Sequence, residues 1–78
     1  MLSTRHEIFL EVAQKNSFSK ASETLFISQP AITKHIKLLE AYYKPPMFER
    51  KGSKIILTPV GELLFKKLNE VKKIQNQL

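Results

Sequence analysis

The spacing of apolar residues predicts helices over the first half of the chain. Ile8, Phe9, Val12 and Ala13 recur three and four positions apart, which places them on one face of a helix over residues 4–16. The positions between them are mostly polar. This pattern is typical of an amphipathic helix that packs on one side only.

Two further helices are expected over residues 20–25 and 29–43, with a short turn between them. The longer helix has two distinct faces. Its apolar face repeats at helical spacing and consists of Ile32, Ile36 and Leu39. Its polar face repeats at the same spacing and consists of Gln29, Thr33 and Lys37. One side should therefore pack against the protein while the other faces outward, although an ordinary solvated polar face would show the same periodicity.

Capping residues support these three helices. Thr4 followed by Glu7 matches a capping box at the start of the first helix. Ser19 and Ser28 are expected to cap the second and third helices, because their hydroxyl groups can accept from first-turn N–H groups. Pro30 fits the opening turn of the third helix, where the N–H that proline lacks has no partner within the helix.

The helix ends are also marked. Asn16 tolerates the left-handed conformation that ends many helices. Pro45 and Pro46 disfavour a helical residue before them, so the third helix should stop at about Tyr43.

Alternating and turn residues in the second half predict a hairpin and a last helix. Two short strands, over residues 48–51 and 54–57, flank Gly52-Ser53, whose glycine-first order suits a type II′ turn. Thr58-Pro59 then caps a helix over residues 59–78. That helix is long for so small a protein. Its apolar stripe is more than the small domain can cover and should serve as a dimer seam, formed by Leu64, Leu68, Val71 and Leu78.

These elements predict an all-α fold with a small β-hairpin wing. Two helices joined by a tight turn have the layout of a helix-turn-helix DNA reader, and the hairpin supplies its wing. We therefore expect a winged helix-turn-helix domain over residues 1–58, followed by a dimerisation helix over residues 59–78. The residues assigned to the core are Phe9, Phe18, Leu25, Ile32, Ile36, Leu39, Phe48, Ile55, Leu57 and Leu63.

Composition favours a polyanion-binding protein. Thirteen lysine and arginine residues stand against seven acidic residues, for a net charge of +6. Basic proteins of membrane surfaces and ribosomes share this balance. The chain has no long apolar run and no hydrophobic signal region at its start, so a cytoplasmic protein without membrane contact is expected. It contains no cysteine, no aspartate and no phosphate-binding glycine loop, so neither an enzyme nor a cofactor or metal is expected.

The outward face of the third helix carries the groups that base edges and phosphates need. Gln29 can pair through its amide with adenine, and Pro30 can contact a thymine methyl group. Thr33 can reach a base or a phosphate. Lys34 and Lys37 are expected on phosphates, because an ammonium group is a point charge with little directional preference.

Further contacts are expected on both sides of this helix. Three serines near helix ends can donate to phosphate: Ser17, Ser19 and Ser28. For Ser19 and Ser28, capping is at least as good a reason. The wing carries cations within reach of the DNA backbone or minor groove: Arg50, Lys51 and Lys54. A solvated basic hairpin would carry the same residues.

The order and spacing of these motifs resemble the amino-terminal DNA-binding domain of LysR-type transcriptional regulators. The matching segments are Ser17-Phe18-Ser19-Lys20-Ala21, Ile27-Ser28-Gln29-Pro30-Ala31-Ile32-Thr33-Lys34, Leu39-Glu40, Met47-Phe48-Glu49-Arg50 and Leu57-Thr58-Pro59-Val60-Gly61. The chain departs from the family at Lys44-Pro45-Pro46, where a glycine turn is usual. The resemblance implies that the last helix is a linker that pairs two protomers. It also implies a small-molecule effector domain, which this sequence does not contain.

Residues and resemblance together predict a dimer that binds duplex DNA in a sequence-specific manner and controls transcription. The third helix would read the major groove, and the wing would contact adjacent backbone or minor groove. Two other functions remain open: a winged-helix module that binds an acidic protein partner, and an architectural protein that binds duplex DNA without sequence preference.

Overall fold

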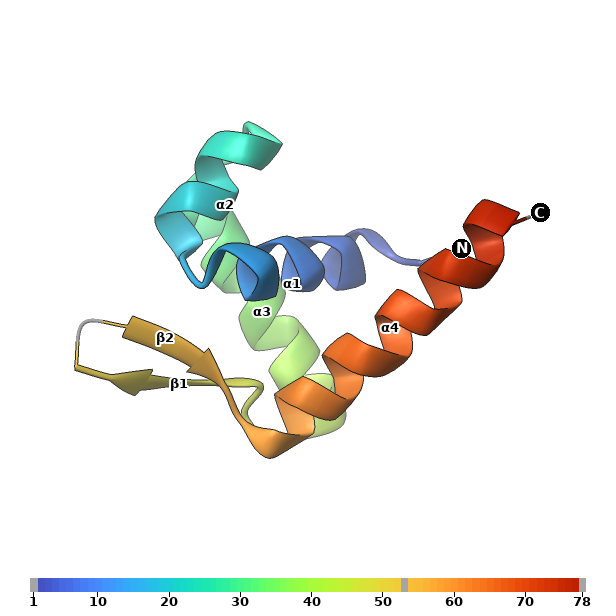
Figure 1. Cartoon of the computed structure of the whole chain (residues 1–78). Helices are drawn as coiled ribbons and strands as arrows, with labels where there is room; N and C mark the ends of the chain where they lie inside the picture. The colour runs from blue at the N-terminus through green and yellow to red at the C-terminus, as the bar shows by residue number, and fades with distance from the viewer. Residues whose placement is uncertain (1, 53, 78) are drawn as a thin grey trace.

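The computed structural model describes residues 2–52 and 54–77. Its elements are α1 (Thr4–Lys15), α2 (Phe18–Leu25), α3 (Gln29–Tyr43), β1 (Phe48–Lys51), β2 (Lys54–Leu57) and α4 (Pro59–Gln77). The first three helices pack together, the hairpin projects to one side of them, and α4 leaves on the other side (Figure 1). This is the predicted winged helix-turn-helix followed by a long helix. Two predicted features, the second residue of the hairpin turn and Leu78 in the stripe, lie outside the described residues.

Two of the predicted caps are wrong by one or two residues. The N-cap of α1 is Ser3, whose Oγ accepts from the N–H of His6 at 3.3 Å, so Thr4 is already helical. The N-cap of α2 is Ser17, whose extended backbone lets its Oγ accept from the N–H of Lys20 at 3.0 Å. Ser19 consequently lies within the first turn. Ser28 caps α3 as predicted.

Within residues 2–52 and 54–77, three residues other than glycine adopt positive φ, each at the end of a helix. Asn16 has φ 53° and donates its N–H to the carbonyl of Val12, which confirms the predicted left-handed helix end. Phe26 ends α2 with φ 57° and a side chain that is 94% exposed. Lys44 ends α3 with φ 79° and ψ −57°, so a lysine occupies a backbone conformation that suits glycine.

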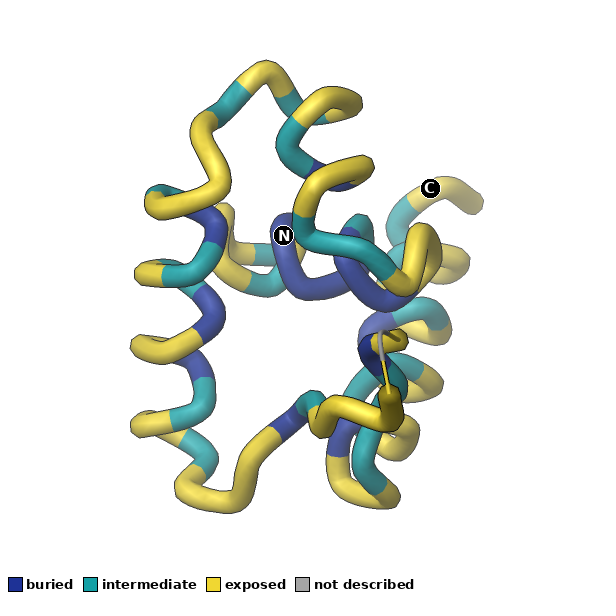
Figure 2. The backbone as a smooth tube through the Cα atoms, turned by 90° about the vertical axis from the view of Figure 1, so that its left-hand side faces the viewer, coloured by how far each residue is buried: buried dark blue, intermediate teal, exposed yellow. Residues whose placement is uncertain are grey.

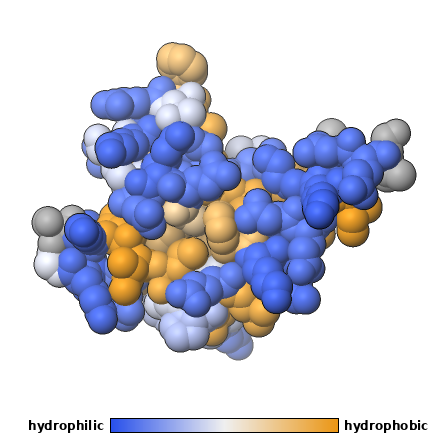
Figure 3. Space-filling view, viewed as in Figure 1, coloured by the Kyte–Doolittle hydropathy of each residue, from blue (hydrophilic) through white to orange (hydrophobic). Residues whose placement is uncertain are grey.

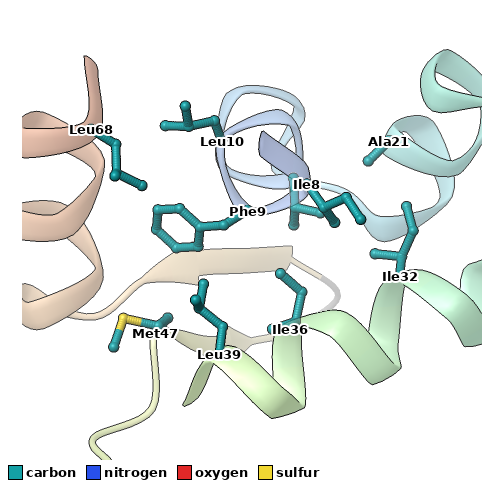
Figure 4. Packing of buried hydrophobic residues seen from close by; sticks show 10 residues of the cluster. Ile8, Phe9, Leu10, Ala21, Ile32, Ile36, Leu39, Met47 and Leu68 are labelled. Atoms are coloured by element: carbon teal, nitrogen blue, oxygen red, sulfur yellow. The ribbon is translucent and has the colours of Figure 1, made fainter. Parts of the chain in front are cut away.

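The core lies between the four helices and the base of the hairpin. In Figure 4, Leu39 of α3 and Leu68 of α4 both point towards the ring of Phe9 on α1. Five of the predicted core residues are buried: Phe9, Ile32, Ile36, Leu39 and Ile55. Four are half-buried and pack against the cluster: Phe18, Leu25, Phe48 and Leu57.

The assignment of Leu63 to the core is wrong, since its side chain is 56% exposed. At 3.6 residues per turn Leu63 lies about 140° around α4 from Leu68, which is the residue that faces the core. Met47 is fully buried although it precedes the first strand, and it had not been assigned to the core. Leu68 was predicted to lie in the dimer seam, but it is only 7% exposed and belongs to the core.

The hairpin is fixed to the helices at its base. Its antiparallel register runs from Phe48 opposite Leu57 to Lys51 opposite Lys54, as the two predicted strands require. The centre of the Phe48 ring lies 5.4 Å from the centre of the Phe9 ring and 6.0 Å from that of the Phe18 ring. Gly52 begins the turn with φ 62°, the positive value expected of a leading glycine.

Candidate nucleic-acid interface

The outward face of α3 carries the polar residues predicted to read DNA. Ser28 begins the helix by accepting from the N–H of Ala31 at 3.2 Å, which leaves the next residues free to project outward. Gln29, Pro30 and Lys34 are exposed. In Figure 2, exposed and buried positions alternate along this helix, because one side packs on the core and the other does not.

A groove of about 440 Å³ runs between α3 and the hairpin. Gln29, Thr33 and Lys37 line it from α3, and Arg50 lines it from β1. Its floor consists of core side chains that reach the surface here: Phe18, Ile36, Phe48 and Ile55. The fold therefore brings four of the predicted contact residues to the walls of one groove, with apolar side chains between them.

A second, shallower hollow of about 610 Å³ lies along the outer side of α3. It shares Gln29, Thr33 and Lys37 with the groove and adds Pro30, Lys34 and Leu38. The residues common to both hollows form the ridge between them. Leu38 is 42% exposed on this surface and had no predicted role.

The start of α2 approaches the same groove. Phe18 lines the groove and is flanked in sequence by Ser17 and Ser19. Ser17 uses its oxygen to cap the helix, and its hydroxyl hydrogen remains available to a phosphate oxygen. Ser19 is exposed in the first turn, where unpaired N–H groups also favour an anion. Neither serine is among the residues that line the groove.

The wing places its remaining cations beyond the groove. Lys51 and Lys54 lie opposite each other at the turn end of the hairpin, and both are exposed. Hydrophobic side chains gather where the hairpin meets the helices, while hydrophilic ones cover its tip (Figure 3). The tip therefore presents charge, and the base attaches the wing to the core.

Two acidic residues that sequence reasoning had not placed here also line the groove. The Oε2 atom of Glu40 accepts from the N–H groups of Met47 at 2.7 Å and Phe48 at 3.4 Å. Glu40 thus links the last turn of α3 to the start of β1 and holds the wing in place. Glu49 is exposed on β1 beside Arg50. In the sequence, the only sign of either residue is its place in two segments that resemble the LysR-type domain, Leu39-Glu40 and Phe48-Glu49-Arg50.

Both histidines lie away from this face. Nε2 of His6 lies 2.9 Å from the Tyr43 hydroxyl, and Nδ1 is hydrogen-bonded to Ser3. Burial lowers the pKa of His6 below its ordinary value. The Nδ1 atom of His35 is buried, so this ring atom is not presented to a ligand. Within residues 2–52 and 54–77 no group of three metal-ligating side chains comes together, and no helix is long and apolar enough to cross a membrane.

Comparison with known proteins identifies the family. Residues 4–62 match the family model described as the bacterial regulatory helix-turn-helix protein, lysR family. This chain belongs to the LysR family. The match spans α1 through the first turn of α4 and so includes every element that lines the groove. A similar relative is the HTH-type transcriptional regulator CitR of Bacillus subtilis, 49% identical over 53 residues, which are 68% of this chain and 18% of CitR.

Solved LysR-family structures have the same fold. A transcriptional regulator of the LysR family from Eggerthella lenta matches with a TM-score of 0.83 and 40% identity, over 88% of this chain and 99% of that one. The BenM DNA-binding domain, in a complex with catB site 1 DNA, matches with a TM-score of 0.89 and 26% identity, over 99% of this chain and 86% of that one. This chain spans about a fifth of the length of the curated relatives it matches.

Proposed function

We propose that this chain binds duplex DNA as the sequence-reading domain of a LysR-type transcriptional regulator. The observation that carries the proposal is the groove between α3 and the wing, where Gln29, Thr33 and Lys37 meet Arg50. An amide, a hydroxyl and two cations are the groups that pair with base edges and phosphates. The DNA complex of the BenM domain, which has the same fold, supports DNA binding by a domain of this shape.

On this proposal the residues of α3 divide between reading and positioning. Gln29 pairs with the N6 and N7 atoms of adenine, and Pro30 contacts a thymine methyl group. Thr33, one turn further along, reaches a base or a phosphate. Lys34 and Lys37 neutralise phosphates on either side of the groove and fix the helix in register without discriminating among sequences.

The flanking elements act on the DNA backbone. Ser17 and Ser19 donate to a phosphate at the start of α2, and Ser28 does so at the start of α3. The wing cations Arg50, Lys51 and Lys54 contact backbone or minor groove beside the major groove that α3 occupies.

The proposed dimer uses the outer side of α4. Among the predicted seam residues, Val71 is 40% exposed, Leu64 is half-buried and Leu68 is buried in its own protomer. The exposed apolar residues of α4 are Val60, Leu63, Val71 and Ile74. At 100° per residue these four lie within about 80° of one another, and so form one stripe along the helix. A second α4 covers this stripe, and the two readers then engage a roughly palindromic site.

In the intact regulator, further sequence supplies a small-molecule effector domain that sets transcription. The protein is then a cytoplasmic, non-enzymatic regulator without a cofactor in this domain. Two alternatives predict different binding. A module for an acidic protein partner has no preferred duplex, and an architectural protein binds all duplexes equally.

The deciding experiment selects duplexes from a random library and compares affinity for the selected sequence with affinity for random duplex at stated salt. Gln29→Ala should cost about 1–3 kcal/mol on the selected sequence alone. The matched control Lys37→Ala should weaken both duplexes alike and reduce the salt slope by about one. Equal weakening of both duplexes by Gln29→Ala would show that Gln29 does not read sequence.

A further inference from the structure

The first turn of α4 is locked to the turn that follows α3. Thr58 donates its hydroxyl to the carbonyl of Pro46 at 2.7 Å, and its backbone N–H donates to the carbonyl of Met47 at 3.0 Å. The Thr58 oxygen also accepts from the N–H of Gly61 at 3.1 Å, which caps the helix. One side chain therefore both starts α4 and holds it against residues 46 and 47.

Gly61 brings the two backbones into direct contact. A Cβ atom added at Gly61 would overlap the carbonyl oxygen of Met47 and would lie 3.0 Å from Cδ2 of Leu57. Because the atom in the way is backbone, only glycine allows α4 to approach this closely.

A second attachment lies further along the helix. Leu68 is buried against the core, and Nζ of Lys72 lies 3.4 Å from Oε1 of Glu7 on α1. Two attachments separated along one helix fix its direction, whereas a single attachment would let the helix turn about that point. These contacts, from residue 58 to residue 72, hold α4 against the helices that carry the reading residues.

The contact of Thr58 and Gly61 with residues 46 and 47 forms a joint between α4 and the end of α3. A small rotation at this joint produces a large displacement at the far end of α3. The turn that receives Thr58 follows directly after α3, and Gln29 lies at the opposite end of α3. Gln29 lies fourteen helical steps before Tyr43, a distance of about 21 Å at 1.5 Å per step. A rotation of about 10° at the joint would move Gln29 by about 4 Å, which exceeds the 3.4 Å between base pairs.

We infer that Thr58 and Gly61 are positioning residues that set the spacing between the two half-sites of the DNA target. This inference rests on the proposed function, in which α4 pairs two protomers. The stripe on α4 fixes one protomer against the other, and the joint at Thr58 and Gly61 fixes each reading helix relative to its α4. The distance between the two reading helices is then determined by the joint, without any contact of these residues with DNA.

The test uses the whole chain and a series of duplexes that carry the selected half-site twice, with the separation varied in single base pairs. Thr58→Asp keeps an acceptor for the N–H of Gly61 but has no hydrogen to donate to Pro46. It therefore removes the side-chain bond to Pro46, while the helix cap and the backbone bond to Met47 remain. Thr58→Ser keeps both bonds and is the matched control. Gly61→Ala forces the two backbones apart by a different route.

Parent and Thr58→Ser should prefer the same separation. In Thr58→Asp and Gly61→Ala, the preferred separation should shift by at least one base pair, or the affinity at the preferred separation should fall by about tenfold. Such a fall is part of the gain in affinity that two linked sites provide. Affinity for a duplex with a single half-site should stay within about twofold of the parent, since the reading residues are unchanged. Circular dichroism confirms that each variant is folded.

Two negative results can be told apart. A parent with a sharp optimum and two folded variants with the same optimum would overturn the role of Thr58 and Gly61 and leave the proposed dimer intact. If Gly61→Ala does not fold, Thr58→Asp against Thr58→Ser still decides. A parent that binds two half-sites no better than one would instead overturn the proposed dimer, and this inference with it.

Discussion

The two sides of α4 should respond differently to the same kind of substitution. Leu68 is buried in the protomer core, whereas Ile74, six residues later, is 60% exposed on the stripe. We therefore compare Leu68→Ala with Ile74→Ala. Both changes shorten an aliphatic side chain on one helix, so helix propensity alone cannot explain a difference in their effects.

The expected magnitudes follow from burial. Truncation of a buried leucine costs about 2–5 kcal/mol, and a position at the edge of the cluster, beside Phe9 and Leu10, should fall near 2–3 kcal/mol. A chain of 78 residues has a total stability of about 4–12 kcal/mol. At about 4–8 °C per kcal/mol, Leu68→Ala should lower Tm by about 8–24 °C.

Ile74→Ala should change the stability of the monomer by no more than about 0.5 kcal/mol, because its side chain is largely exposed there. In the proposed dimer it removes apolar contact from both protomers at once, about 1–2 kcal/mol each. The dissociation constant of the dimer should rise about 30-fold or more.

Thermal and denaturant unfolding at a concentration where the protein is monomeric measure the effect on stability. Sedimentation equilibrium measures the effect on the dimer. Loss of stability in Ile74→Ala at that concentration, or a parent-like Tm in Leu68→Ala, would refute the division of α4 into a core side and a partner side. A dimer of unchanged affinity in Ile74→Ala would place the seam elsewhere.

Three further predictions test other parts of the molecule. Lys44→Gly should stabilise the protein by about 1 kcal/mol in thermal unfolding, because it removes strain at φ 79°. The control Asn16→Gly should be nearly neutral in the same assay, because asparagine tolerates φ 53°. Lys51→Ala with Lys54→Ala should reduce the salt slope of DNA binding by about two without changing the selected sequence, and a new consensus would contradict this. Because burial lowers the pKa of His6, the unfolded chain binds more protons below pH ~6.5 and the His6 contribution to stability falls as pH drops through that range. His6→Leu should lose that part of the pH dependence in denaturant titrations at pH 5 and pH 7.5, and an unchanged acid response would exclude His6 as its source.

Local signals were enough to predict most of the fold. The end of α1 at Asn16, the start of α3 at Ser28 and both strands of the wing follow from residues within a few positions of each boundary. The caps at Thr4 and Ser19 were misplaced because neighbouring serines and threonines are equally able to cap. Only the backbone conformation decides among them.

Long-range contacts could not be predicted in the same way. The stripe on α4 was predicted from spacing alone, and spacing does not tell which apolar residues already have partners in the same protomer. Leu68 therefore appeared to belong to the seam although it packs in the core, and Met47 had no periodic signal because it lies outside any helix or strand. Among the site residues, the side chains of α3 were found from their spacing, whereas the groove depends on how the wing docks through Glu40.

The segment from Lys44 to Met47 shows how a departure from the family pattern can keep the family geometry. A glycine would adopt the positive φ of Lys44 without strain, but it would also leave the turn flexible. Pro45 and Pro46 restrict φ at two successive positions, so few conformations remain for this turn. The strain at Lys44 is retained because this turn is held on both sides, by the bond from Met47 to Glu40 and by the bonds from Thr58 to Pro46 and Met47. The same few residues thus end α3, lead into the wing and receive α4, so a change in this turn should alter both the docking of the wing and the direction of α4.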